Sequence, residues 1–269
     1  MTADSSKPTD RQKPTARVFC IANQKGGVGK TTTAINLAAA LALHGRRVLL
    51  VDLDPQGNAT MGSGIDKNQA ETNLYQVLIG EADVASARVR SESGGYDVLP
   101  ANRELSGAEI DLVQMPDRER RLKGALQAVG EDYDFVLIDC PPTLSLLTLN
   151  GLAAAHGVII PMQCEYFALE GLSDLVNTIK RVHANLNPDL RVIGLLRVMF
   201  DPRVTLQQVS AQLESHFGDK VFKSVIPRNV RLAEAPSYGL PGVVFDPASK
   251  GAQAYVSFGA EMIERVKTL

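Results

Sequence analysis

The sequence predicts an α/β protein with a mostly parallel, twisted sheet and helices on both of its faces. Short apolar runs rich in β-branched residues alternate with longer amphipathic segments, which is the pattern of repeated strand–helix units. A glycine-rich loop joins the first of these strands to the first long helical segment. Of the 269 residues, 45% are hydrophobic and 22% are charged, so a large core is expected and a disordered or coiled-coil chain is excluded.

Seven apolar runs are expected to be buried strands, because each is short and ends at polar or turn-forming residues. In chain order they are Val18–Asn23, Arg47–Asp52, Tyr96–Pro100, Phe135–Asp139, Gly157–Pro161, Val192–Met199 and Lys223–Ile226. Six longer segments are expected to be helices, namely Lys30–His44, Arg118–Val129, Leu144–Ala154, Leu169–Leu186, Thr205–Phe217 and Ala252–Lys267. Gly45 directly follows the first helical segment, as glycine commonly does at the end of a helix.

The chain divides into a short tail and one domain. Residues 1–16 are rich in Ser, Thr, Pro, Asp and Lys and have no apolar period, which predicts a disordered N-terminal tail. That tail is too short for a DNA-reading helix-turn-helix unit. Residues 17–269 contain no internal repeat and no change of composition, so we expect a single domain there.

Charge, cysteines and hydropathy indicate a cytoplasmic protein. The net charge is −2, which excludes a uniformly basic nucleic-acid binder but leaves room for a local basic surface. The three cysteines, Cys20, Cys140 and Cys164, have spacings of neither a disulfide framework nor a metal site. The apolar run Ala34–Leu43 is far shorter than the ~18 residues that span a bilayer.

The loop from Asn23 to Thr32 has the composition and context of a phosphate-binding loop. It follows an expected strand and opens an expected helix, so glycine N–H groups and the helix N-terminus can converge on phosphate oxygens. Lys30 is placed to reach the terminal phosphates, and the Thr31 hydroxyl can bind Mg²⁺. The expected nucleotide-binding residues are Lys25, Gly26, Gly27, Val28, Gly29, Lys30, Thr31 and Thr32. The expected fold is therefore of the P-loop NTPase kind.

This loop departs from the ordinary G-x-x-x-x-G-K-[ST] pattern in one respect. Gln24 occupies the position of the first glycine, and an additional lysine, Lys25, stands at the front of Lys-Gly-Gly-Val-Gly-Lys-Thr. That arrangement is the deviant form of the Walker A motif.

Three aspartates follow apolar strands. Asp52 and Asp54 alternate at the end of one run, near the place where a phosphate loop on an adjacent strand would open. One of them can orient a water molecule, and Asp52 is also a candidate metal ligand. Asp139 ends the run Phe135–Asp139 and fits a Walker B carboxylate that holds Mg²⁺ through water. Cys140, which follows it, is expected to be a small buried residue rather than a nucleophile.

Several stretches resemble the deviant Walker A ATPases of the ParA/MinD superfamily. The first three are Lys25–Thr33, Val51–Thr60 and Leu137–Pro142. Two others, Gln163–Leu172 and Val225–Ser237, look specifically like the ParA/Soj chromosome-partitioning branch. The resemblance covers nearly everything from residue 17 to the C-terminus.

The resemblance implies an ATPase that uses ATP and Mg²⁺ and works as a nucleotide-sandwich homodimer. It implies that Lys25 reaches the phosphates bound by the partner subunit, that Lys30 binds phosphate within its own subunit, and that Asp54 positions the hydrolytic water. Pro227 and Asn229 would lie against the adenine. Hydrolysis would depend on dimerisation, because Lys25 supplied by the partner acts like an arginine finger.

The segment Lys180–Arg231 carries nine basic and four acidic residues, a net charge of +5 in a chain of net charge −2. Such an asymmetry is typical of a protein that binds phosphate backbones through one face. The resemblance selects Arg203 and Arg231 as DNA contacts, with Lys250 as a further candidate. No groove-reading motif accompanies them, so binding to double-stranded DNA is expected to be nonspecific and salt-dependent.

Together these observations predict a cytoplasmic, nucleoid-associated partitioning ATPase, with no membrane partner. Its ATP-dependent homodimer would bind DNA nonspecifically, and a ParB-type centromere-binding protein, implied by the resemblance alone, would stimulate hydrolysis and release. The main alternative is a MinD-like membrane-cycling ATPase, which needs an amphipathic C-terminal helix that residues 261–269 hardly provide. An iron–sulfur or metal-cluster protein, a small-molecule kinase and a DNA-coating protein without turnover are the remaining alternatives.

Overall fold

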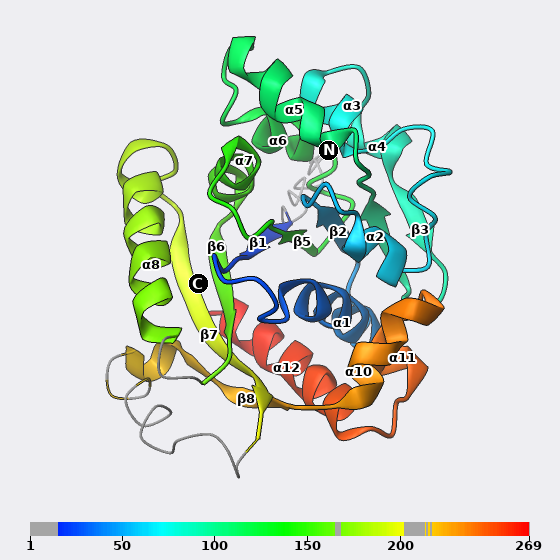
Figure 1. The fold of residues 1–269 in the computed structure, drawn as a ribbon, viewed down its shortest axis with the longest axis vertical. Coiled ribbons are helices and arrows are strands. Elements are labelled where there is room, and N and C mark those ends of the chain that lie inside the picture. Colours follow the sequence, from blue (N-terminus) through cyan, green and yellow to red (C-terminus); the bar gives the residue numbers. More distant parts are fainter. Residues whose placement is uncertain (1–15, 165–167, 202–212, 214, 216, 269) are drawn as a thin grey trace, which may run out of the picture.

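A computed structural model describes residues 16–164, 168–201, 213, 215 and 217–268. Within these residues eight strands form one sheet in the order β3-β4-β2-β5-β1-β6-β7-β8 (Figure 1). All neighbours are parallel except β3, which runs antiparallel to β4. The strands are β1 (Arg17–Ile21), β2 (Val48–Asp52), β3 (Val89–Ser91), β4 (Tyr96–Leu99), β5 (Phe135–Asp139), β6 (Gly157–Met162), β7 (Arg191–Phe200) and β8 (Val221–Pro227).

Helices connect most of these strands. The longer ones are α1 (Lys30–Leu43), α7 (Leu146–Ala154), α8 (Ala168–Asn185) and α12 (Lys250–Val266). The shorter ones are α2 (Asn58–Gly62), α3 (Leu74–Ile79), α4 (Val84–Ala87), α5 (Leu105–Asp111), α6 (Arg121–Gln127), α10 (Val230–Glu234) and α11 (Gly242–Phe245). Three 3₁₀ turns cover Leu112–Gln114, Gly218–Lys220 and Ala235–Tyr238.

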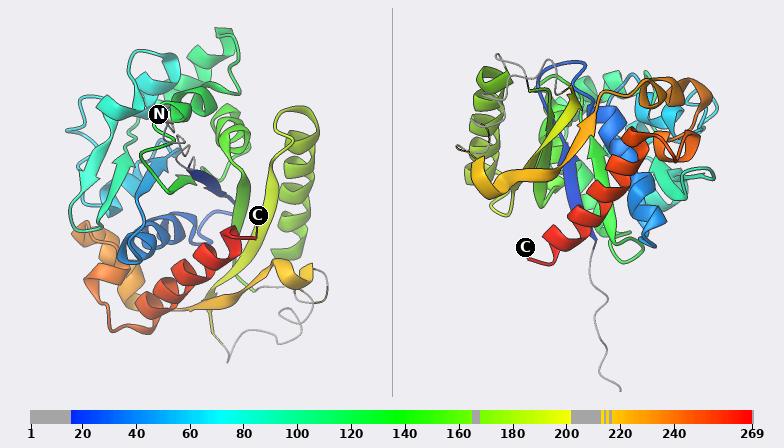
Figure 2. Two further views of the ribbon diagram at one scale, coloured as in Figure 1. Left: turned by 180° about the vertical axis from the view of Figure 1, so that it is seen from behind. Right: turned by 90° about the horizontal axis from the view of Figure 1, so that it is seen from below.

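The helices cover both faces of the sheet, as the sequence predicts. Alternation along β1 shows the two cores: Phe19 and Ile21 pack with α1 and α12, whereas Val18 and Cys20 pack with α6, α7 and α8. Helices α1 and α12 lie side by side in both views (Figures 1 and 2). Because the central strands β1, β2 and β5 are buried on both faces, their interior residues are apolar, and polar residues occur only at their ends.

The expected elements agree with the structure in kind and differ at their ends. All seven expected strands are present, and five of the six expected helices are found. The sixth, Thr205–Phe217, lies mostly outside the described residues, as does the expected tail up to residue 15. Ala16, expected at the end of that tail, is instead part of the domain: it is buried, and its N–H donates to the Gly130 carbonyl at 2.7 Å. The edge strand β3 was not expected.

The order of the strands corrects one expectation about the site. The phosphate loop follows β1 and Asp52 ends β2, but these two strands are not neighbours because β5 lies between them. Asp139 at the end of β5 pairs in register with Ile21 of β1 and with Asp52 of β2. The carboxyl ends of β1, β5 and β2 therefore stand in a row at one edge of the sheet.

Both outer strands of the sheet offer few free backbone groups with which a further strand could pair. Strand β3 is only three residues long. On β8, the Glu261 carboxylate of α12 accepts hydrogen bonds from the N–H groups of Lys223 and Ser224, both at 2.8 Å. These contacts occupy backbone donors that an additional strand would need.

Candidate functional site

The phosphate loop runs from the end of β1 to the first residue of α1. Gly27 and Gly29 both have left-handed backbone conformations, with φ of 71° and 76°, which side chains with a Cβ rarely adopt. Gly29 is the N-cap of α1, and no side chain among the described residues caps the helix. The first N–H groups of α1 are therefore directed to the loop, where a phosphate can accept from them.

Lys30 is a buried cation at the start of this helix. Its side chain is 7% exposed, and Nζ donates to the Lys25 carbonyl of the loop at 3.2 Å. Burial lowers the pKa of Lys30, and the nearby charges of Asp139, Cys140 and Asp54 oppose that shift. Lys30 is thus a desolvated donor held at the inner surface of the phosphate loop.

Lys25 lies at the exposed outer part of the same loop. Its N–H donates to Asn23 Oδ1 at 3.0 Å, and Asn23 Nδ2 donates to the Pro161 carbonyl of β6 at 2.8 Å. The side chain of Lys25 is exposed. The two lysines of the motif therefore differ in environment, with one inside the site and one at the surface.

Asp139 is a buried carboxylate whose oxygens are free to bind a ligand. It is 1% exposed, and neither Oδ1 nor Oδ2 has a hydrogen-bond partner among the described residues. Burial raises the pKa of Asp139 well above its usual range, and the neighbouring Asp52 adds to the shift, while Thr31 and Lys30 oppose it. A buried carboxylate without partners beside a hydroxyl fits the water shell of Mg²⁺, so these residues suit that metal.

We expect Asp139→Asn to stabilise the ligand-free chain by about 1 kcal/mol or more at neutral pH, because it removes a carboxyl group whose ionised form is disfavoured by burial. Urea unfolding measures this as a higher midpoint. The matched control is Asp97→Asn, since Asp97 accepts from Arg90 and Tyr133 and its replacement should not stabilise the chain. A lower midpoint for Asp139→Asn than for the unchanged chain would contradict this reading of the site.

Asp52 and Asp54 have different environments. Asp52 is fully buried, and its carboxylate accepts from Thr60 N–H at 2.8 Å, Thr60 Oγ1 at 2.7 Å and Asp54 N–H at 3.2 Å. Burial raises the pKa of Asp52 to about 6, and these hydrogen bonds oppose the shift. Asp52 therefore anchors α2 and the loop before it. Asp54 is half-buried, with Oδ1 accepting from Gln56 N–H at 2.9 Å, and it lies nearer the surface.

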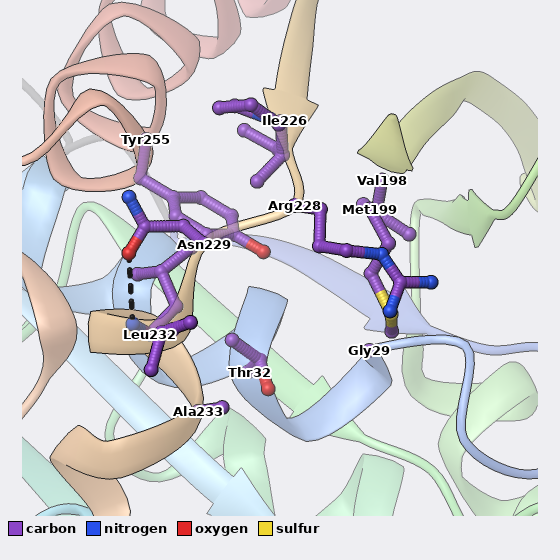
Figure 3. Close-up of a pocket in the computed structure, with 12 residues that line it drawn as sticks. Gly29, Thr32, Val198, Met199, Ile226, Arg228, Asn229, Leu232, Ala233 and Tyr255 are labelled. Atoms are coloured by element: carbon purple, nitrogen blue, oxygen red, sulfur yellow. Dashed lines mark hydrogen bonds between the residues drawn. The ribbon is translucent and has the colours of Figure 1, made fainter. Parts of the chain in front are cut away.

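A pocket of about 290 Å³ opens beside the phosphate loop (Figure 3). Its lining comes from α1, β7, β8, α10 and α12, and it includes the predicted base-contact residues Pro227 and Asn229. Asn229 Oδ1 caps α10 by accepting from Arg231 N–H at 2.9 Å and Leu232 N–H at 3.3 Å. With its oxygen so used, the N–H₂ group is the part of the Asn229 amide that can donate a hydrogen bond.

Sequence reasoning missed part of this pocket. Val198, Met199 and Tyr255 line it together with Thr32 and Gly29 of the predicted loop. The three missed residues belong to β7 and α12, which are far from the loop in sequence. No local motif marks them, because only the packing of α12 and β7 beside α1 brings them there.

The described residues of the basic segment Lys180–Arg231 do not form one surface. Lys180 and Arg181 lie on α8, and Arg231 lies on α10. Arg191 is the first residue of β7 and so lies at the amino ends of the strands, whereas the phosphate loop lies at their carboxyl ends. Figure 1 shows α8 and α10 on opposite sides of the molecule. The described basic residues of this segment therefore do not share one face, because the segment contains two strands of the sheet, β7 and β8, and parts of the flanking helices α8 and α10.

Two of the three candidate DNA contacts, Arg231 and Lys250, lie among the described residues, on α10 and at the start of α12. Arg231 is exposed and pairs with Glu234 at 3.0 Å and Asp246 at 3.5 Å, which are surface pairs of small energy. Lys250 is exposed at the first turn of α12. Arg203 lies outside the described residues.

Comparison with known proteins gives consistent matches along the chain. Residues 16–192 match a family model described as an AAA domain. The chromosome partitioning protein ParA of Caulobacter vibrioides is 54% identical over 252 residues, covering 93% of this chain and 94% of that protein. The sporulation initiation inhibitor protein Soj of Bacillus subtilis is 53% identical over 247 residues, covering 91% and 98%.

A solved structure supports the same fold. It is described as cobyrinic acid a,c-diamide synthase from Mycobacterium smegmatis with a bound ATP analogue and magnesium. It superposes with a TM-score of 0.82 at 41% identity and covers 94% of this chain and 96% of that one.

Proposed function

Because this chain belongs to the ParA/Soj family of chromosome-partitioning ATPases, we propose that it is a Mg²⁺-dependent ATPase that binds nonspecific double-stranded DNA as an ATP-dependent homodimer and associates with the nucleoid. A ParB-type centromere-binding protein would stimulate hydrolysis and so release the dimer. The observation that carries the proposal is the row formed by the phosphate loop after β1, Asp139 at the end of β5 and Asp54 two residues after the end of β2, three neighbouring strands.

The residues of this row divide the work of phosphoryl transfer. The loop N–H groups and the Lys30 ammonium hold the phosphates, and Thr31 with Asp139 would hold the metal, Asp139 through water. When bound, Mg²⁺ neutralises charge on the β- and γ-phosphate oxygens. Asp54, half-buried at the open side of the site, orients the attacking water. Asp52 takes no part in this scheme because its carboxylate holds Thr60.

The exposed position of Lys25 supports a role between subunits. Its side chain lies at the outer part of the loop, where a second copy facing the carboxyl ends of the strands can receive it. A γ-phosphate held between two copies would favour the dimer, and its loss would favour separate subunits. Nucleotide state would thereby control DNA affinity without any contact between nucleotide and DNA, because two weak surfaces joined in one dimer bind more tightly.

The terminal helix favours this reading over the membrane-cycling alternative. Three bulky apolar residues of α12, Tyr255, Phe258 and Met262, are buried against the domain, and Val256, Ile263 and Val266 pack partly buried against the same core. They are therefore not available to enter a bilayer while the helix is docked. In the part of the chain that the structure describes, no helix has the length and apolarity needed to span a membrane.

The deciding experiment measures retention of nonspecific double-stranded DNA with ATP, ADP or no nucleotide across a salt series. Asp54→Ala holds the ATP state, because it removes the residue that would orient the water. We expect retention with ATP alone, falling steeply as salt rises. Absence of DNA binding in every nucleotide state would reject the DNA-binding part of the proposal, and ATP-dependent binding to liposomes instead would favour the MinD-like alternative.

Replacing Arg231 by alanine is expected to weaken ATP-dependent DNA retention several-fold and to reduce the slope of affinity against salt by roughly two for the dimer, one per lost phosphate contact. We expect Arg203→Ala to act in the same direction. The matched control is Arg47→Ala, another exposed arginine in an ion pair, which directly precedes β2 at the amino ends of the strands, away from the phosphate loop. Unchanged retention by both variants would remove these residues from the DNA-binding surface.

A further inference from the structure

Gln163 and Met199 connect the phosphate loop to the pocket of about 290 Å³ beside it. We call this pocket the base pocket, because the proposed function places the adenine of ATP there. Gln163 follows β6, the strand beside β1, and Met199 lies near the end of β7. Gln163 Nε2 donates to the Gly27 carbonyl at 3.3 Å and to Met199 Sδ at 3.0 Å. Since both of these neighbours only accept hydrogen bonds, the nitrogen of the amide must face them.

Met199 is held in a conformation that few non-glycine residues adopt. Its φ is 50°, in the left-handed region that is sterically disfavoured for a residue with a Cβ. Its side chain lines the base pocket and points toward Gly29 (Figure 3), where a Cβ added to the glycine would lie 3.5 Å from Met199 Cε. Backbone strain of this kind persists where the surroundings hold the residue in place, and it is frequent at functional sites.

The phosphate loop is attached to the end of β6 by two side chains. Asn23 Nδ2 donates to the Pro161 carbonyl and fixes the beginning of the loop. Gln163 fixes the carbonyl of Gly27, which lies between the two lysines of the motif. The peptide at Gly27 therefore depends on a side chain that also contacts the wall of the base pocket.

We propose that Gln163 and Met199 are positioning residues through which an occupied base pocket fixes the phosphate loop at Gly27. A purine in the pocket contacts the Met199 thioether and restricts its side chain. Met199 in turn holds the Gln163 amide, and the amide holds the Gly27 carbonyl. The base and the triphosphate of one nucleotide thereby bind cooperatively. This inference rests on the proposed function, because it takes ATP to be the ligand of the site.

The first test compares two ligands, Mg²⁺·ATP and Mg²⁺·tripolyphosphate, by calorimetric titration. Tripolyphosphate fills the phosphate loop and leaves the base pocket empty. We expect Gln163→Leu, which keeps the bulk and loses the donor, to weaken ATP binding at least about fivefold more than tripolyphosphate binding. Equal losses of affinity for the two ligands would overturn the proposed link between the base pocket and the phosphate loop. The control is Gln253→Leu on the exposed side of α12, for which neither affinity should change.

A double-mutant cycle tests whether Met199 acts on the phosphate loop through Gln163. Met199→Leu keeps an apolar wall and removes the sulfur acceptor. If the two residues act as one unit, Gln163→Leu together with Met199→Leu weakens ATP binding no more than the stronger single variant, whereas additive losses would overturn the link. Gln163→Glu, which places an acceptor against two acceptors, provides a second variant if circular dichroism shows that Gln163→Leu does not fold, and the same preferential loss of ATP affinity is expected.

These outcomes separate the link from the proposed function. An unchanged chain that binds ATP, with a Gln163→Leu variant whose two affinities fall equally, rejects the link and leaves the ATPase intact. An unchanged chain that does not bind Mg²⁺·ATP rejects both.

Discussion

Replacing Lys30 with alanine is expected to lower kcat/KM for ATP hydrolysis by about a thousandfold, because a preorganised donor acting on developing phosphate charge in a water-poor site is worth that much. The Lys30 ammonium is buried at the inner surface of the loop, where it contacts only a backbone carbonyl among the hydrogen bonds that the structure shows. A γ-phosphate would replace that contact with a neutral carbonyl by one with an anion, so that both partners carry charge. Release of inorganic phosphate over a range of ATP concentrations measures the loss.

The control for this variant is Lys267→Ala. Lys267 is an exposed lysine at the end of α12 and pairs with Glu264, so its loss should leave turnover unchanged. Thermal melting of both variants shows whether the fold is retained. A folded Lys30→Ala variant that loses less than about tenfold in kcat/KM would contradict the role given to this residue.

Lys25→Ala is expected to reduce turnover by about a hundredfold or more while ATP affinity stays near its normal value, since a lysine supplied by the partner acts like an arginine finger. The reason lies in exposure: Lys25 is at the surface of its own subunit, whereas Lys30 is inside the site. Turnover and ATP binding are measured separately, the second by titration at low protein concentration, where dimers are few.

Mixing two inactive variants decides in which subunit Lys25 acts. In a mixed dimer of Lys25→Ala with Asp54→Ala, the site on the Lys25→Ala subunit keeps its own Asp54 and receives Lys25 from the partner. An equal mixture should therefore recover roughly a quarter of normal turnover, since half of the dimers are mixed and one of their two sites is complete. No recovery on mixing would place the action of Lys25 within its own subunit.

The fold was predictable where the chain crosses the centre of the sheet. Phe135–Asp139 is an uninterrupted apolar run, and the strand occupies those residues without change. Strand β3 was missed because its three residues include Arg90, which is exposed and pairs with Asp97, and therefore carry no buried-strand pattern. The short helices α2 to α5 were missed because four to seven residues are too few to show a helical period.

The site was predictable where it is contiguous in sequence. The phosphate loop is one run of residues, so its composition alone identifies it. The structure adds what spacing could not show, namely that Asp139 lacks partners while Asp52 is occupied by Thr60. The base pocket is assembled from α1, β7, β8, α10 and α12, which are far apart in sequence, and its contribution from Met199 depends on a left-handed backbone that the local sequence does not indicate.

The occupied edges of the sheet bear on how copies of this protein can gather. A protein that concentrates on one polymer brings many identical sheets close together, and exposed strand edges at such concentrations lead to fibres. Glu261 fills the donors of Lys223 and Ser224 on one outer strand, and the other outer strand ends after three residues. Growth by strand addition is thereby discouraged. Under the proposed function, crowding on DNA would stay reversible, and association would be left to the nucleotide-bearing face, where hydrolysis would undo it.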